Sequence, residues 1–209
     1  MWGLLPKSLY CIKIQYFDMS YAELHCLSNY SFLRGASHPS ELVEQAVHLG
    51  YSALAITDEC SLAGVVKAHV VAKELDFKLI IGSEFNVSEG LKLVAIAPSR
   101  VAYGELSNLI SRSRRRSEKG QYLTHLRDIY FHLKRCFIIW LPTHIDEEKH
   151  HADILSRRFA DRFWIGVTQL LHHDDTTRLT ELQQIASELK APLIACLLYT
   201  SPSPRDFTE

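Results

Sequence analysis

The sequence has few cysteines, and no two of them have metal-binding or disulfide spacing. The five stand singly along the chain, at Cys11, Cys26, Cys60, Cys136 and Cys196. An odd number of scattered cysteines argues against a disulfide framework, and the lack of any Cys-x-x-Cys pair argues against a zinc knuckle. Unpaired thiols are typical of a reducing compartment, so we expect a cytoplasmic protein.

The sequence also lacks a long apolar run and an excess of charge of either sign. No stretch approaches the roughly 18 apolar residues that a membrane span needs, so we expect no membrane partner. Lys and Arg total 23 against 24 for Asp and Glu, which gives a formal net charge of -1. No domain-wide basic field can therefore hold a nucleic-acid backbone, and any such role must be local or belong to segments outside this sequence.

Several catalytic signatures are missing as well. The sequence contains no P-loop glycine pattern and no Gly-x-Ser-x-Gly elbow, which argues against nucleoside triphosphate hydrolysis and acyl-enzyme chemistry. Between Pro98 and Cys196, no strand carries the paired aspartates that could hold two Mg²⁺ ions for nucleotidyl transfer. The chemistry of this chain must therefore be sought elsewhere.

What the sequence does contain is an alternation of strand and helix patterns. Its 209 residues, 47% of them apolar, are enough for one α/β domain with its own core. The predicted strands cover residues 21–27, 53–57, 78–81, 91–97, 136–141, 163–168 and 192–196, and the predicted helices cover residues 40–49, 62–75, 102–116, 146–159 and 176–189. This rhythm predicts βαβ units with parallel strands. About seven such strands predict a barrel whose site lies at the carboxyl ends of the strands.

Both ends of the chain depart from this rhythm. Residues 1–18 show neither period clearly, and we assign them to an N-terminal extension. After Cys196, a run of serine and proline interrupts the last unit where a loop and a helix are due. We expect residues 197–209 to be a non-native tail, similar to read-through into a sequencing adapter. The domain is thus predicted to span residues 19–196 and to stop before the barrel closes; sequencing the source locus past Cys196 tests this.

Polar side chains mark the ends of three predicted strands: His25, Asp58, Glu59 and Glu84. Because the carboxyl ends of barrel strands meet at one rim, these side chains can approach one another despite their separation in the chain. A histidine with several carboxylates suits Zn²⁺ or Mn²⁺, whose bound water would then be a nucleophile.

Each of these residues also has a structural explanation. Asp58 precedes a helix and could cap it, and His25 could be a hydrogen-bonded core histidine. Glu84 is the sharper signal, because a carboxylate directly after an apolar run needs a partner if it is buried. That partner could equally be a nearby arginine or lysine.

The same positions carry a family resemblance. The stretches ELHCLSNYSFLRGAS (23–37), ALAITDECSLAGVVKAH (53–69) and KLIIGSEF (78–85) together resemble the N-terminal PHP (polymerase and histidinol phosphatase) domain of C-family bacterial DNA polymerases. They most resemble the error-prone branch, which acts in damage-induced translesion synthesis. The resemblance covers residues 19–196 and implies the distorted (β/α)7 barrel of PHP domains, here incomplete at its C-terminus.

The resemblance also implies a metal ligand set, which this sequence matches only in part. Metal-competent PHP domains carry His-x-His on the first strand, Asp-His after the second and a glutamate after the third. His25, Asp58 and Glu84 match these positions, whereas Leu27 replaces the second histidine and Glu59 replaces the histidine after the aspartate.

Two later positions also depart from the family pattern. Lys92 stands where the fourth strand should begin with histidine, and its ammonium would repel a metal ion and could neutralise the carboxylates instead. The Gly-Asp-x-His segment that the family carries after the last strand is absent beyond Cys196. We therefore expect a degraded metal site.

A cluster of basic residues is the remaining candidate site: Arg112, Arg114, Arg115, Arg116 and Lys119. It could contact a phosphate backbone or a neighbouring polymerase domain. Alternatively, it is a solvated helix end, where cations interact favourably with the helix dipole.

The resemblance implies a domain that supports a DNA polymerase and has no catalytic residue of its own. The parent protein would perform DNA-templated translesion synthesis in DNA repair, using Mg²⁺ in a palm domain further along its chain. Its partners would be the palm and thumb domains, DNA through the parent, and a sliding clamp with translesion accessory proteins. The alternative is a metal-dependent PHP phosphoesterase or 3'-5' exonuclease, with Zn²⁺ or Mn²⁺ on the reduced ligand set.

Overall fold

A computed structural model describes residues 21–168 and 175–196 of the chain. Its strands are β1 (Ala22–Cys26), β2 (Ala53–Ile56), β3 (Leu79–Asn86), β4 (Lys92–Ile96), β5 (Phe137–Trp140), β6 (Phe163–Val167) and β7 (Leu193–Ala195). Its helices are α1 (Pro39–His48), α2 (Val65–Glu74), α3 (Arg100–Arg115), α4 (Leu126–His132), α5 (Ile145–Phe159), the short 3-10 helix η1 (Ala160–Arg162) and α6 (Asp175–Leu189). The seven predicted strands and five predicted helices are confirmed, whereas the sequence pattern missed α4. The expectations for residues 1–18 and 197–209 lie outside the described residues and stay predictions.

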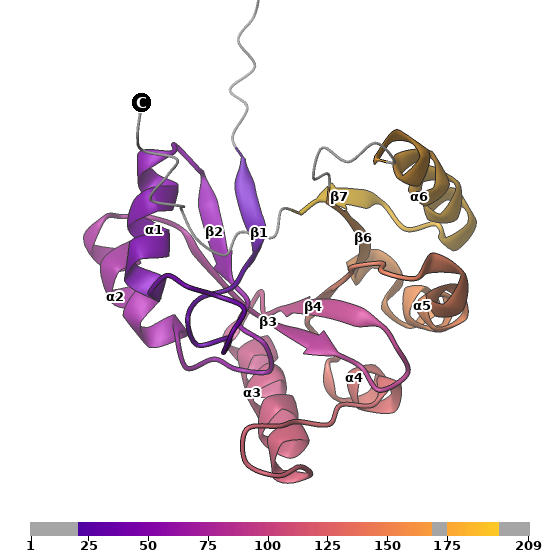
Figure 1. The fold of residues 1–209 in the computed structure, drawn as a ribbon, viewed down its shortest axis with the longest axis horizontal. Helices are drawn as coiled ribbons and strands as arrows, with labels where there is room; N and C mark the ends of the chain where they lie inside the picture. The colour runs from indigo at the N-terminus through magenta and orange to yellow at the C-terminus, as the bar shows by residue number, and fades with distance from the viewer. Residues whose placement is uncertain (1–20, 169–174, 197–209) are drawn as a thin grey trace, which may run out of the picture.

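All seven strands form one sheet in the order β1-β2-β3-β4-β5-β6-β7. Figure 1 shows this sheet curled on itself, with the helices outside and the edge strands β1 and β7 facing each other across the opening. The predicted α/β fold, a distorted barrel that is not closed among the described strands, is confirmed in this arrangement.

The prediction that all strands are parallel was wrong for β4. This strand runs antiparallel to both β3 and β5, while the other neighbouring pairs are parallel. A tight turn replaces a crossover helix: Val87 donates its backbone N–H to Leu91 O at 2.8 Å, and Gly90 takes a φ of +93°. Positive φ is the conformation that glycine adopts without strain. The turn sends the chain straight back along β3.

Successive side chains along each strand point to opposite faces of the sheet. The outward side chains of β3 to β6 meet α3, α5 and α6 in the largest apolar cluster, which includes Phe85, Leu93 and Trp140. The buried Trp140 donates its indole N–H to Glu148 Oε2 at 2.6 Å. Burial of these large side chains is the main stabilisation of this half of the sheet.

The inner face is apolar over most of its area and polar at one end. Val94, Ile96 and Ile139 belong to an inner apolar cluster, beside a hollow of about 550 Å³ that Ile96 and Ile139 also line. Glu84 pairs with Val94 across β3 and β4 and so faces the same interior, at the carboxyl end of the parallel strands. Among the described residues, no helix is long and apolar enough to cross a membrane.

Candidate functional site

The loop between β1 and α1 is anchored to the end of β2 by Asp58. The buried carboxylate of Asp58 accepts hydrogen bonds from Ser28 N at 2.8 Å, Ser28 Oγ at 2.7 Å and Ser31 Oγ at 2.7 Å. Both oxygens are therefore used to hold the loop, and α2 begins only at Val65. Asp58 does not cap a helix, and its carboxylate makes none of its hydrogen bonds with the other three predicted site residues, although its backbone carbonyl accepts from Glu84 N at 3.3 Å.

A close backbone approach then turns the loop back over the strand ends. A Cβ atom on Gly35 would lie 2.0 Å from Ser28 O, so only glycine fits at this position. Arg34 N and Gly35 N both donate to Ser31 O at 3.0 Å, which closes a tight turn. As a result, the side chain of Arg34 is carried from the loop to the carboxyl ends of β2 and β3.

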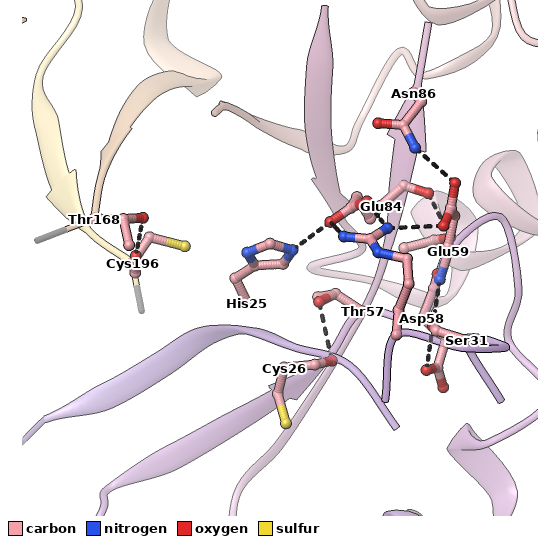
Figure 2. A network of polar contacts seen from close by, with 12 residues as sticks. His25, Cys26, Ser31, Thr57, Asp58, Glu59, Glu84, Asn86, Thr168 and Cys196 are labelled. Carbon is pink, nitrogen blue, oxygen red and sulfur yellow. Dashed lines mark hydrogen bonds and ion pairs between the residues drawn. The ribbon is translucent and has the colours of Figure 1, made fainter. Parts of the chain in front are cut away.

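Arg34 and His25 meet at the carboxylate of Glu84. His25 Nε2 lies 2.6 Å from Glu84 Oε2, and Figure 2 shows the imidazole of His25 pointing toward this carboxylate. Arg34 donates from Nη2 to Glu84 Oε2 at 3.1 Å, and from Nη1 to Glu84 Oε1. The Glu84 side chain is fully buried, so its charge is stabilised inside the protein by the guanidinium of Arg34 and by the contact with His25.

The pKa of Glu84 reflects this environment. Burial alone would raise it, because a low dielectric disfavours the charged carboxylate. The hydrogen bonds from His25 and Arg34, together with their charges, outweigh burial and lower the pKa of Glu84 from 4.5 to about 2. Glu84 is therefore ionised at neutral pH and accepts hydrogen bonds.

Glu59 completes the network on the other side of Arg34. Its Oε2 accepts a hydrogen bond from Arg34 Nη1 at 2.8 Å. Its Oε1 accepts from Tyr122 OH at 2.7 Å and from Asn86 Nδ2 at 2.6 Å, the latter contact being visible in Figure 2. Burial opposes ionisation of Glu59, but Arg34 and Tyr122 outweigh it and lower its pKa. Both carboxylates are thus held as anions by one guanidinium.

The structure brings three of the four predicted residues together: His25, Glu59 and Glu84. The sequence pattern placed Glu84 after the third strand. In the structure Glu84 lies within β3, because this strand continues to Asn86 in its pairing with β4. The cation between the carboxylates is Arg34, which sequence reasoning did not name. The available signal was that a buried carboxylate needs a cationic partner.

Lys92 does not take the role that the sequence suggested for it. Its backbone pairs with Asn86 at the start of β4. Among the described ion pairs, those of Glu59 and Glu84 are made with Arg34 and His25, and none involves Lys92. The loop after β1, and not the fourth strand, supplies the neutralising charge.

These residues do not fit a metal ion as they stand. Three donors of a kind that binds Zn²⁺ or Mn²⁺ are present in His25, Glu59 and Glu84. The guanidinium of Arg34, however, bonds to both carboxylates and so occupies, with its positive charge, the oxygens that a metal would need. Within the described residues, no group of three or more His, Cys, Asp or Glu is arranged to hold a metal.

The structure divides the basic cluster into residues with internal partners and residues that face outward. Arg114 donates to Glu59 O and Cys60 O, both at 3.1 Å, and its guanidinium lies 5.2 Å from the centre of the Tyr122 ring. Arg116 makes a two-pronged ion pair with Asp128. Exposed residues make up the rest of the cluster: Arg112, Arg115 and Lys119. Together with Arg116, Arg112 and Arg115 line a small hollow of about 230 Å³.

Comparison with known families identifies the domain. The PHP domain family matches residues 23–191, which includes every residue of the network. The chain belongs to the PHP family.

The sequence relatives are much longer proteins. The chain is 52% identical over 181 residues to the error-prone DNA polymerase of Saccharophagus degradans, 49% over 177 residues to that of Teredinibacter turnerae, and 52% over 177 residues to that of Methylococcus capsulatus. The alignments cover 84–85% of this chain and 17% of each relative. This chain thus spans about a sixth of the length of the relatives that it matches.

The solved structures that resemble the chain share its fold at low sequence identity. A candidate metal-dependent phosphoesterase from Bifidobacterium adolescentis aligns with a TM-score of 0.63 at 15% identity, covering 88% of each chain. An amidohydrolase from Chromobacterium violaceum, with bound sulfate and no metal, aligns with a TM-score of 0.62 at 15% identity, covering 88% of this chain and 89% of that one. At this identity the likeness shows the PHP fold alone.

Proposed function

We propose that this chain is the amino-terminal PHP domain of an error-prone DNA polymerase and that it serves the polymerase as a scaffold. The observation that carries the proposal is about 50% identity to error-prone polymerases along most of the chain. The parent would carry out DNA-templated translesion synthesis in repair. Its Mg²⁺ and catalytic carboxylates would belong to the palm domain.

The ion network supports a scaffold over a hydrolase. A hydrolytic PHP site needs carboxylates that are free to bind a metal and its water. Here Glu59 and Glu84 are already bonded to Arg34, and the carboxylate of Asp58 is fully used in holding the loop. The domain's partners would be the palm and thumb of the parent and, through the parent, DNA, a sliding clamp and accessory proteins.

Metal content and hydrolytic activity test this proposal. The domain should be produced with the native sequence of its source locus past Cys196, alongside a Glu84→Ala variant. We expect neither stoichiometric Zn²⁺ or Mn²⁺ nor phosphatase or 3'-5' exonuclease activity. Bound metal together with an activity that Glu84→Ala abolishes would instead establish the PHP hydrolase, in which His25, Asp58, Glu59 and Glu84 form a reduced ligand set.

The polymerase role requires a separate experiment on the full-length parent. Primer extension on a template with a single lesion should depend on Mg²⁺ and on the parent's palm domain. A Glu84→Gln substitution in the PHP domain should leave the extension rate per folded molecule unchanged. A parent without template-directed synthesis would overturn the polymerase assignment, whatever the metal content of the PHP domain.

For the outward-facing arginines, we propose contact with the phosphate backbone of DNA that the parent holds. Support comes from the exposure of Arg112, Arg115 and Lys119 and from the hollow that Arg112 and Arg115 line with Arg116. Replacing Arg112 and Arg115 together by glutamine in the parent should weaken DNA binding and reduce its salt dependence by about two phosphate contacts. An unchanged salt dependence would instead favour contact with a neighbouring domain or a solvated helix end.

A cytoplasmic location belongs to the same proposal. Four cysteines lie in the described part of the chain, and all four are buried, unpaired thiols: Cys26, Cys60, Cys136 and Cys196. Such thiols persist in a reducing compartment. Fractionation of the source cells, with immunodetection of the parent, tests the location.

A further inference from the structure

Three potential metal donors on separate elements are linked through Arg34 and Glu84. His25 lies on β1, Glu84 on β3, and Glu59 after β2. Arg34 Nη1 donates to both Glu84 Oε1 and Glu59 Oε2, while Glu84 Oε2 receives Arg34 Nη2 at 3.1 Å and faces His25 Nε2 at 2.6 Å. One guanidinium thus lies between the two carboxylates, and His25 bonds to one of them.

We propose that Arg34 is a built-in replacement for a divalent cation and that its removal turns the site into a Zn²⁺- or Mn²⁺-binding site. The proposal goes beyond the scaffold role, because it specifies which cation the site holds and what the remaining side chains can bind. It depends only on the geometry of this domain and not on the polymerase assignment.

The charges in the site favour this exchange. Glu84, which is fully buried, and Glu59, which is partly buried, contribute two negative charges, and Arg34 supplies one positive charge. Truncating Arg34 removes the cation that both carboxylates bond to, with the His25 imidazole still bonded to Glu84. Like charges at close range repel strongly when they are poorly solvated. A dication would cancel both charges and take an imidazole nitrogen and carboxylate oxygens as ligands.

The donors do not depend on Arg34 for their positions. Arg34 comes from the loop, whereas His25 and Glu84 are fixed by strands β1 and β3. Glu59 is additionally held by Tyr122 and Asn86, at 2.7 and 2.6 Å. The loop has its own anchor in Asp58. Removing the guanidinium should therefore empty the space between the carboxylates without displacing its walls.

The test compares metal binding by four forms of the 209-residue chain: wild type, Arg34→Ala, Arg34→Lys and the double variant Arg34→Ala with Glu84→Gln. Each is freed of metal with a chelator and titrated with Zn²⁺ or Mn²⁺, following binding by calorimetry and the melting temperature by circular dichroism. Any metal that the wild type and the double variant bind measures binding by the other histidines of the chain. The extra binding by Arg34→Ala is then due to this site.

We expect one equivalent of Zn²⁺ or Mn²⁺ to bind Arg34→Ala and to raise its melting temperature, because the ion binds the folded form alone. The wild type should show neither effect, and the double variant should bind at least about tenfold more weakly than Arg34→Ala. Arg34→Lys should fold without metal, since its ammonium keeps a positive charge in the site.

Two results would overturn the proposal. One is a folded Arg34→Ala that binds no more metal than the wild type. The other is a wild type that binds one equivalent at this site, with binding lost in a single Glu84→Gln variant. If Arg34→Ala does not fold when metal-free, refolding it with and without Mn²⁺ decides the question: folding only with Mn²⁺ supports the proposal, and no folding in either condition contradicts it.

Discussion

The network around Glu84 and the arginines at the end of α3 both concentrate positive charge, but they place it in opposite surroundings. Arg34 points inward to two carboxylates, one of them on a fully buried side chain. Arg112 and Arg115 are exposed beside an open hollow. An arginine side chain is therefore needed to balance carboxylates inside the protein in the first region. In the second region the arginines are exposed and can contact another molecule or domain.

This difference explains why the two regions should respond differently to mutation. A charge without solvent must be balanced by nearby protein groups, so the loss of its partner is costly. An exposed charge is balanced by water and salt, so its loss changes stability little. The predictions below test this contrast, beginning with the strongest expected effect.

Replacing Arg34 by methionine should have the largest effect. The change keeps roughly the length of the side chain but leaves the Glu84 carboxylate with His25 as its side-chain partner, and leaves Glu59 with Tyr122 and Asn86. We expect the free energy of unfolding to fall by about 3 to 5 kcal/mol, measured by urea denaturation. Arg112→Met is the matched control and should change it by less than about 0.5 kcal/mol. Equal losses of unfolding free energy in Arg34→Met and Arg112→Met would contradict the difference between the buried and the exposed region.

Acid should weaken the network through Glu84. Because its pKa is lowered from 4.5 to about 2, the stabilisation by its ionised form is complete above pH 4.5 and is lost as the pH falls toward 2. Other carboxyls also titrate in this range, so the comparison is between wild type and Glu84→Gln. The stability advantage of the wild type should shrink by about 3 kcal/mol across this interval. An advantage that is constant with pH would contradict the lowered pKa.

Removing the loop anchor should cost less than removing the cation. Asp58→Ala eliminates the acceptor of three hydrogen bonds from Ser28 and Ser31 and leaves the buried Ser28 N–H without its partner. We expect a loss of about 2 kcal/mol and faster proteolysis beside Phe32, which is 85% exposed. Ser31→Ala removes one of these bonds and should show a smaller change. Unchanged cleavage at Phe32 would mean that Asp58 does not hold the loop.

Much of the fold could be predicted because buried positions must be apolar, and they recur in the sequence with the repeat of a strand or a helix. Leu54 and Ile56 of β2, for example, are fully buried, and their apolar run identified the strand. The direction of β4 was mispredicted although the sequence contains the signal: a parallel crossover needs a dozen or more residues, and only residues 87–91 join β3 to β4. Helix α4 was missed because its seven residues are too few to show a clear helical period.

The site could be predicted only as far as strands determine it. His25 and Glu84 lie on neighbouring parts of one sheet, and the convergence of strand ends correctly indicated their approach. Arg34 reaches the same point from a loop, whose path depends on Asp58, distant in sequence, and on the close packing that Gly35 permits. Contacts between residues that are distant in sequence leave no repeating pattern in the sequence. It could therefore be predicted that Glu84 needs a cation, but not that the cation is Arg34.

The smallest effect, and the finest test of the contrast, lies within the basic cluster itself. Arg114 and Arg115 are adjacent, but Arg114 donates to the carbonyl oxygens of Glu59 and Cys60 and stacks on Tyr122, whereas Arg115 donates only a 3.3 Å bond to Ser111 O on its own helix. Arg114→Met should lower the free energy of unfolding by about 1 to 2 kcal/mol, and Arg115→Met by less than about 0.5 kcal/mol, both measured by urea denaturation. Because Arg114 holds the segment that carries Glu59, its loss should add less than its full value in a double variant with Arg34→Met. Full additivity would mean that Arg114 and the Glu84 network are energetically independent. Arg114 would then belong with the arginines at the end of α3 and not with the internal network around Glu84.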